Sequence, residues 1–214
     1  MPALRAGVDV LTDHFPKAKP SGAGVGRLLV ASLHQGIADV LPARLDFYES
    51  WLNPAGLRDG RIGLAPMAAV LSFLRQEGER YDEIASRAGA YTAEWMVLAM
   101  SPVERRFAAA LPPRLRLWYV MRLVRRLVRQ TYSGSRAVVR WRSGGVGAVD
   151  LRGSLFCQVR EPVAHPLCAF YAAAFQRLAT LFQLEVTVQT DGCRGAGAPK
   201  CLIALAIRPE AAAQ

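Results

Sequence analysis

Apolar residues recur every three or four positions through the first two-thirds of the chain, which is the spacing of amphipathic helices. Pro42, Gly78 and the pair Pro112–Pro113 fall where these periodic stretches should stop or start. The pattern predicts helices over residues 26–41, 44–52, 61–78, 79–100 and 113–132.

The pattern changes after the turn residues "SGS" at 133–135. Short β-rich, glycine-punctuated stretches follow at 136–141 and 145–159, then a helix opened by Pro166, and then strands at 184–190 and 200–209. Helices followed by strands with tight turns indicate an α+β domain, with an antiparallel sheet flanked by helices. We expect residues 26–207 to form that domain, with a flexible arm at 1–25 and a frayed tail at 208–214.

The composition favours a globular chain with an anionic partner. Of the 214 residues, 52% are hydrophobic and 21% charged, and the net charge of +10 comes almost wholly from arginine. Nucleic acid, anionic lipid or acidic small molecules would all suit such a charge. The arginines are scattered without a nucleic-acid-binding motif, so nucleic acid is not expected, and membrane contact is not favoured.

The first 24 residues lack an uninterrupted apolar core and contain Asp9, Asp13 and His14, which argues against a secretory signal. We therefore expect a cytoplasmic protein. In that compartment cysteines are reduced thiols or metal ligands and do not form a disulfide framework.

All four cysteines lie in the last part of the chain, at Cys157, Cys168, Cys193 and Cys201. They could be unrelated buried thiols, but Cys193 and Cys201 flank a glycine-rich turn, "CRGAGAPKC", that joins two expected strands. Four thiolates suit a soft tetrahedral ion such as zinc. His165 and Asp191 lie near enough in sequence to replace Cys157 as fourth ligand.

The stretch from Gly153 to Ile207, with a cysteine before "CAFYAAAF" and the closing pattern C-x-x-x-G-x-x-x-C, resembles the C-terminal half of the 4-vinyl-reductase domain. The segments "YTAEWMVLAM" and "PPRLRLWYVMRLVRRLVRQTYSGS" look like helices of its bacteriochlorophyll-synthesis member. The resemblance covers roughly residues 60–207.

This resemblance implies a fold like that of TRAPP transport-complex subunits (the NO-signalling and Golgi-transport ligand-binding fold), a homodimer, and a hydrophobic pocket between helices and sheet. It also implies a structural zinc on Cys168, Cys193 and Cys201, with a glutamate where this chain has Thr190. Since Thr190 cannot replace that carboxylate, Cys157 becomes the expected fourth ligand.

The expected ligand-binding residues combine aromatic walls with arginine anchors. On the helix that starts at Pro113, arginines occupy one face and apolar residues largely another. That helix could also be a core helix with a solvated basic face. The residues expected to bind ligand are Trp118, Tyr119, Arg122, Arg126, Phe156 and Tyr171.

Catalytic residues are not evident in the sequence. No nucleophile and base occur in a persuasive context, and no nicotinamide or flavin motif is present. We expect a binding protein for a hydrophobic, tetrapyrrole-like molecule such as a bacteriochlorophyll precursor, which it presents to a biosynthetic enzyme. The alternatives are a divinyl tetrapyrrole 4-vinyl reductase using an external electron donor, and a dimeric interaction scaffold or small-molecule sensor.

Overall fold

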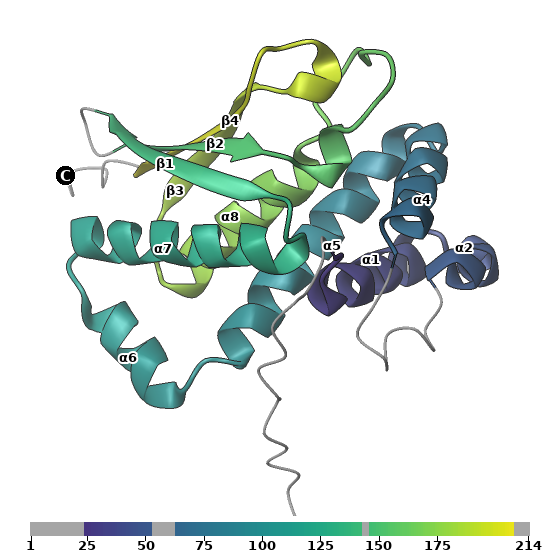
Figure 1. Cartoon of the computed structure of the whole chain (residues 1–214). Helices are drawn as coiled ribbons and strands as arrows, with labels where there is room; N and C mark the ends of the chain where they lie inside the picture. The colour runs from purple at the N-terminus through teal and green to yellow at the C-terminus, as the bar shows by residue number, and fades with distance from the viewer. Residues whose placement is uncertain (1–23, 53–62, 143–145, 208–214) are drawn as a thin grey trace, which may run out of the picture.

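The computed structural model describes residues 24–52, 63–142 and 146–207, and helices make up most of its first part (Figure 1). The expected tail at 208–214 and all but the last two residues of the expected arm lie outside these ranges. The helices of this part are α1 (Arg27–Val40), α2 (Leu45–Leu52), α4 (Leu64–Gln76), α5 (Glu79–Leu98), α6 (Pro102–Ala110) and α7 (Pro113–Thr131), with a 3-10 turn η1 (Pro42–Arg44) before α2.

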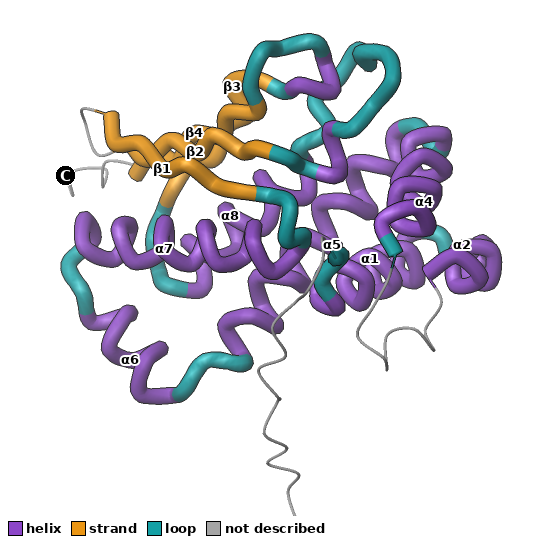
Figure 2. The backbone as a smooth tube through the Cα atoms, viewed as in Figure 1, coloured by secondary structure: helices purple, strands orange, loops and turns teal. Residues whose placement is uncertain are grey.

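The second part contains a four-stranded antiparallel sheet and one long helix, as Figure 2 shows by colour. The strands are β1 (Arg136–Arg142), β2 (Val146–Arg152), β3 (Val186–Gly192) and β4 (Cys201–Ile207), in the order β1-β2-β4-β3. Helix α8 (Ala169–Leu181) and two 3-10 turns, η2 (Leu155–Cys157) and η3 (Arg194–Ala196), complete it. The predicted α+β class with an antiparallel sheet is confirmed.

The structure differs from the sequence prediction in several places. The stretch expected as strand over 145–159 ends as β2 at Arg152 and continues into η2. The helix expected from Pro166 begins only at Ala169, so Cys168 occupies the N-cap position instead of the first turn. Helix α6 was not predicted; Pro102 occupies its first turn, and the Ser101 hydroxyl caps it by accepting a hydrogen bond from the Glu104 amide at 3.1 Å.

Helices α5 and α8 form the closest helix pair of the core. At their crossing Gly89 lies against the backbone of Phe170, and a Cβ at that position would come within 2.1 Å of the Phe170 carbonyl oxygen. Glycine is the only residue that permits this separation. The packing of α5 on α8 therefore sets where the start of α8, and with it Cys168, is placed.

The turn between α7 and β1 is held by the start of the described chain. The Gly24 amide donates to the Ser133 hydroxyl at 2.9 Å, Val25 forms a β-bridge with Tyr132, and the Ser135 hydroxyl donates to the Gly153 carbonyl at 2.8 Å. Gly24 and Val25, the last residues of the expected arm, are thus part of the folded unit. This turn fixes how α7 and the edge strand β1 lie against each other.

Candidate functional site

The four cysteines come together above one end of the sheet, although they are spread over 45 positions of the sequence. Cys157 ends η2, Cys168 precedes α8, Cys193 lies between β3 and η3, and Cys201 begins β4. Their sulfur atoms all lie within 4.8 Å of one another. The closest pairs are Cys157–Cys168 at 3.4 Å, and Cys157–Cys193 and Cys168–Cys193 at 3.5 Å. We call this set the thiol cluster.

The glycine-rich turn that brings Cys193 beside Cys201 is closed by the backbone. The amides of Ala196 and Ala198 both donate to the Cys193 carbonyl, each at 3.0 Å. Gly197 takes a φ of 84°, a left-handed conformation that glycine adopts without strain. The Val163 amide donates to the Gly195 carbonyl at 2.8 Å, which attaches the segment before α8 to the same turn.

The thiols of the cluster differ in the direction in which their pKa is shifted. The pKa of Cys193 is lowered because neighbouring thiols hydrogen-bond to its sulfur, Cys157 first, while burial opposes the shift and the Leu167 amide, which donates at 3.3 Å, adds to it. The pKa of Cys201 is also lowered, because Cys157 and then Cys168 hydrogen-bond to its sulfur, and the Arg194 amide, which donates at 3.3 Å, adds to the shift. The pKa of Cys168 is raised, since its thiol hydrogen-bonds to Cys157 and the other sulfurs, and burial acts in the same direction.

The other expected ligands lie outside the cluster. His165 is exposed in the loop before α8, and Asp191 pairs with Arg142 at 3.2 Å. Among the residues described, only the four cysteines bring atoms that can bind a metal close together at this place. The fourth member of the thiol cluster is therefore Cys157, which the sequence also favoured over His165 and Asp191.

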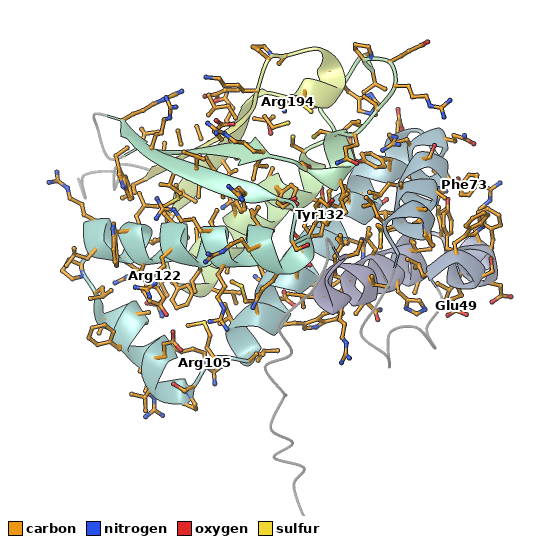
Figure 3. All side chains as sticks on the ribbon, viewed as in Figure 1. Glu49, Phe73, Arg105, Arg122, Tyr132 and Arg194 are labelled. Atoms are coloured by element: carbon orange, nitrogen blue, oxygen red, sulfur yellow. The ribbon has the colours of Figure 1, made fainter. Side chains whose placement is uncertain are left out.

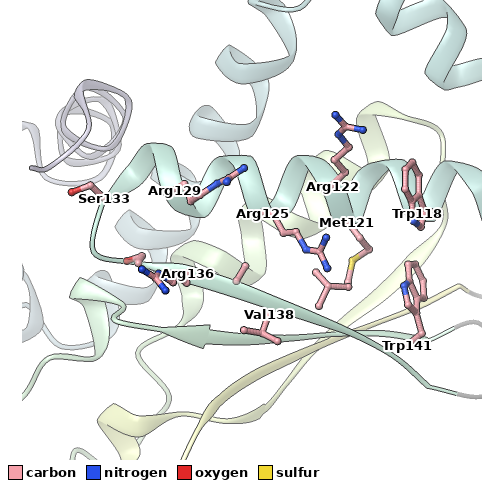
Figure 4. Close-up of a pocket in the computed structure, with 12 residues that line it drawn as sticks. Trp118, Met121, Arg122, Arg125, Arg129, Ser133, Arg136, Val138 and Trp141 are labelled. Carbon is pink, nitrogen blue, oxygen red and sulfur yellow. The ribbon is translucent and has the colours of Figure 1, made fainter. Parts of the chain in front are cut away.

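A second feature is an open groove of about 770 Å³ between α7 and the edge strand β1 (Figure 4). Trp118 on α7 faces Trp141 on β1 at one end, and Met121 and Arg125 lie between them and the other end. We call it the Arg–Trp groove. The residues that line it are Trp118, Met121, Arg122, Arg125, Arg129, Ser133, Ser135, Arg136, Ala137, Val138, Val139 and Trp141.

The groove carries an uncompensated positive charge. Within the described ranges, none of its four arginines (Arg122, Arg125, Arg129 and Arg136) forms an ion pair, and no acidic side chain lines the groove. Trp118 and Trp141 remain 52% and 48% exposed. Guanidinium groups bind carboxylate and phosphate oxygens through paired hydrogen bonds, so the groove is suited to an anion.

The structure separates the six residues that were predicted to bind ligand. Trp118 and Arg122 line the groove, whereas Arg126 is exposed beside it. Tyr119 turns to the other side of α7, where its hydroxyl donates to Glu104 at 2.7 Å and its ring meets Phe182 edge-on. Burial and that hydrogen bond raise the pKa of Tyr119 to about 12.

The remaining two, Phe156 and Tyr171, belong to the core. Phe156 stacks on Phe170 with ring centroids 4.6 Å apart, and Tyr171 meets both rings edge-on. All three side chains are at most 1% exposed. Phe156 and Tyr171 therefore pack in the core and do not line the groove between α7 and β1.

Sequence reasoning missed most of the groove. Trp118, Arg122, Arg125 and Arg129 follow one another at spacings of four, three and four, which places them in one stripe along α7. That spacing was visible in the sequence, but the contribution of β1 was not. Figure 3 shows Arg122 on α7 well separated from Arg194 in the cysteine turn, so the groove and the thiol cluster are distinct sites.

Comparisons with known proteins identify the fold. No family model and no curated protein matches the sequence. Among solved structures, the chain is similar to a crystal structure of an H-NOX protein from S. oneidensis in the Fe(II)NO ligation state, with a TM-score of 0.57, 11% identity, and coverage of 86% of this chain and 99% of that one. It is also similar to the NMR structure of the SO2144 H-NOX domain from Shewanella oneidensis in the Fe(II)CO ligation state, with a TM-score of 0.53, 13% identity and coverage of 87% and 99%.

A third neighbour, described as "Probing the function of heme distortion in the H-NOX family", has a TM-score of 0.51 at 10% identity and covers 85% of this chain and 94% of its own. Such low identities establish the fold and nothing more specific. The chain has the fold of H-NOX domains.

This finding corrects the expected family, the expected functions and the expected cofactor. The resemblance to the 4-vinyl-reductase domain is wrong, because the structural neighbours are H-NOX domains. The expected roles in tetrapyrrole delivery, vinyl reduction and bacteriochlorophyll synthesis fall with it. Zinc as the cofactor is also wrong: the neighbours are described with heme and Fe(II), and the proximity of four thiols does not identify zinc.

None of the helices in the described ranges combines the length and hydropathy needed to cross a membrane.

Proposed function

We propose that this chain is a small-molecule-binding domain built on the H-NOX fold, and that its ligand is an anion held in the Arg–Trp groove. The observation that supports the proposal is the groove itself, where four arginines without acidic partners line a cavity beside two half-exposed tryptophans. Ligand sites usually combine an apolar wall with a few polar groups that fix orientation. Here the indole rings supply the wall and the guanidinium groups supply the anchors.

Heme, named in the description of one structural neighbour, does not fit the groove. Its carboxylates would suit the arginines, but heme iron also needs an axial ligand, commonly histidine, cysteine, tyrosine or methionine. The groove offers only Met121, whose thioether packs against Gly147 on β2.

The side chains that commonly ligate iron lie elsewhere in the described structure. His34 is held by Glu49, with 2.6 Å between Nε2 and Oε1, and His165 is exposed before α8. Tyr48, Tyr81 and Tyr171 are buried and hydrogen-bonded. The residues of the groove therefore do not fit heme iron, and the proposed ligand is an anion that needs no metal coordination.

Titration with hemin tests this assignment. Because no histidine, cysteine or tyrosine lines the groove, we expect the Soret band to stay broad, as for hemin free in solution, and to be unchanged in a His34→Ala variant. The measurement is the absorption spectrum at rising hemin concentration. A sharp Soret band at one hemin per chain, lost on replacing a single histidine, would show that the chain is a heme protein and the proposal is wrong.

Isothermal titration calorimetry tests the groove directly, with ATP and 1-pyrenebutyrate as anionic probes. We expect at least one to bind, and Arg125→Gln to weaken that binding about tenfold, since one hydrogen bond to a charged group is worth about 1.5–3 kcal/mol. Arg126→Gln is the matched control, because Arg126 is the next residue of the same helix but lies outside the groove. Absence of binding by both probes at millimolar concentration, or equal loss in the two variants, would refute the proposal.

We further propose that the thiol cluster holds a thiophilic metal ion. All four sulfur atoms lie within 4.8 Å of one another, so a single ion between them would contact every one. Thiolates favour soft metal ions. Four protein ligands complete the shell, so the ion would act structurally, joining η2, α8, η3 and β4, and metal analysis would determine which ion it is.

Two narrower expectations stay predictions, the homodimer and a cytoplasmic location. The TRAPP-subunit-like fold label is wrong, because the structural neighbours are H-NOX domains. The expected biosynthetic enzyme as partner is dropped together with tetrapyrrole delivery.

A further inference from the structure

The Arg–Trp groove has two ends of different chemistry. Helix α7 and strand β1 are consecutive and run in opposite directions, because the chain reverses at residues 132–135. As a result Trp118 faces Trp141 at the open end, whereas Arg129 lies near Arg136 beside the turn (Figure 4). The two tryptophans therefore lie at one end of the groove, and Arg129 and Arg136 lie at the other.

The length of the groove follows from the geometry of its two walls. From Trp118 to Arg129 the helix advances by eleven residues, or about 16 Å at 1.5 Å per residue. From Arg136 to Trp141 the strand advances by five residues, or about 17 Å. Both walls therefore match in length, and a ligand that reaches from one end to the other must be elongated.

Each end is open to interaction with a ligand. Within the described structure neither Trp118 nor Trp141 makes a ring contact with another aromatic side chain, although both are about half exposed. An exposed indole offers a flat face on which an aromatic ring can stack. At the other end, Arg125, Arg129 and Arg136 have no acidic partner in the described structure.

We propose that the ligand of the groove is an elongated molecule in which a flat aromatic ring is joined to one or more acidic groups. The ring lies between Trp118 and Trp141, and the acidic groups meet Arg125, Arg129 and Arg136. The inference rests on the proposed function and adds to it the class of ligand and its orientation. The acidic groups are phosphates or carboxylates, since guanidinium groups bind both in the same paired geometry.

Calorimetry with whole probes and their parts tests this inference and distinguishes the two sources of charge. The phosphate series is ATP, adenosine and inorganic tripolyphosphate; the carboxylate series is 1-pyrenebutyrate, 1-pyrenebutanol and butyrate. In at least one series we expect the whole probe to bind at least tenfold more tightly than either part. The series in which this occurs identifies the acidic group.

Two variants test the orientation. Trp141→Leu should weaken binding of the whole probe about tenfold and leave the acidic part (tripolyphosphate or butyrate) unchanged. Arg136→Gln should weaken the whole probe and the acidic part equally, and leave the ring part (adenosine or 1-pyrenebutanol) unchanged. Arg126→Gln again serves as control, and an unchanged melting temperature in each variant shows that the fold is retained.

The outcomes separate this inference from the function on which it rests. If tripolyphosphate and butyrate bind as tightly as ATP and 1-pyrenebutyrate, and Arg125→Gln weakens them, the groove binds anions but the aromatic ring contributes nothing, and the inference alone is wrong. If the ring parts bind as tightly as the whole probes, the acidic groups contribute nothing and both proposals are wrong. Failure of every probe to bind refutes both as well.

Discussion

If the thiol cluster holds the proposed metal ion, replacing Cys193 with serine is expected to release it and to lower the free energy of unfolding by more than about 4 kcal/mol, the range in which loss of a structural metal falls. Cys193 contacts the sulfurs of Cys157 and Cys168 and accepts the Leu167 amide. Its loss therefore removes one ligand and loosens the connection between the last two strands and the start of α8. The measurements are metal content per chain and the midpoint of chemical denaturation.

A matched control lies in the same turn. Ala196→Ser adds a hydroxyl to the turn and removes no sulfur. Its metal content should equal that of the parent, and its free energy of unfolding should stay within about 0.5 kcal/mol of the parent value. Stability of the parent protein should also fall on treatment with a chelator, whereas the Cys193→Ser variant should not respond. Parent protein that contains no metal, and a Cys193→Ser variant that unfolds at the same denaturant concentration, would show that the cluster is only a group of buried thiols.

Replacing Gly89 with alanine is expected to lower the free energy of unfolding by about 3 kcal/mol, the upper part of the range for overpacked cores. Alanine would place a Cβ 2.1 Å from the Phe170 carbonyl oxygen, and a backbone atom inside a helix cannot move aside as a flexible side chain can. The higher helix propensity of alanine offsets only about 0.5–1 kcal/mol. Thermal or chemical denaturation measures the difference.

The control for Gly89 is Ser86→Ala on the same helix, where the side chain is only partly buried. It makes a similarly small change without a new backbone contact, and should leave stability within about 0.5 kcal/mol of the parent. A Gly89→Ala variant as stable as Ser86→Ala would mean that α5 and α8 do not approach as closely as described. Gly89→Ala should also reduce the metal content per chain, because a shift of α8 would displace Cys168.

Helices with strong apolar periodicity were predictable from the sequence, and α6 was not. Over Pro102–Ala110 only Ala108 is buried, so there is almost no apolar stripe to recognise. Its start was nevertheless encoded locally by the cap Ser101 and by Pro102. The late start of α8 was harder to foresee, because the position of Cys168 is set by contacts with η2 and the cysteine turn, far away in the sequence.

The two sites differed in how well the sequence could predict them. The glycine-rich turn between Cys193 and Cys201 brings two thiols together locally, so the cluster could be inferred from spacing. The groove depends on β1 being an edge strand beside α7, which no local pattern reveals. Phe156 and Tyr171 were assigned to a ligand pocket because aromatic residues suit both pockets and cores, and only their burial distinguishes the two.

Because the turn at residues 132–135 joins α7 directly to β1, the Arg–Trp groove is formed by one contiguous segment of the chain. Its two long walls are adjacent in sequence and joined by this one short turn, so residues 118–141 contain all of its lining side chains. Changes in ligand preference can therefore arise within a single contiguous segment, without altering the packing of α5 on α8 or the thiol cluster. Exchange of that segment between related chains would carry the binding preference with it.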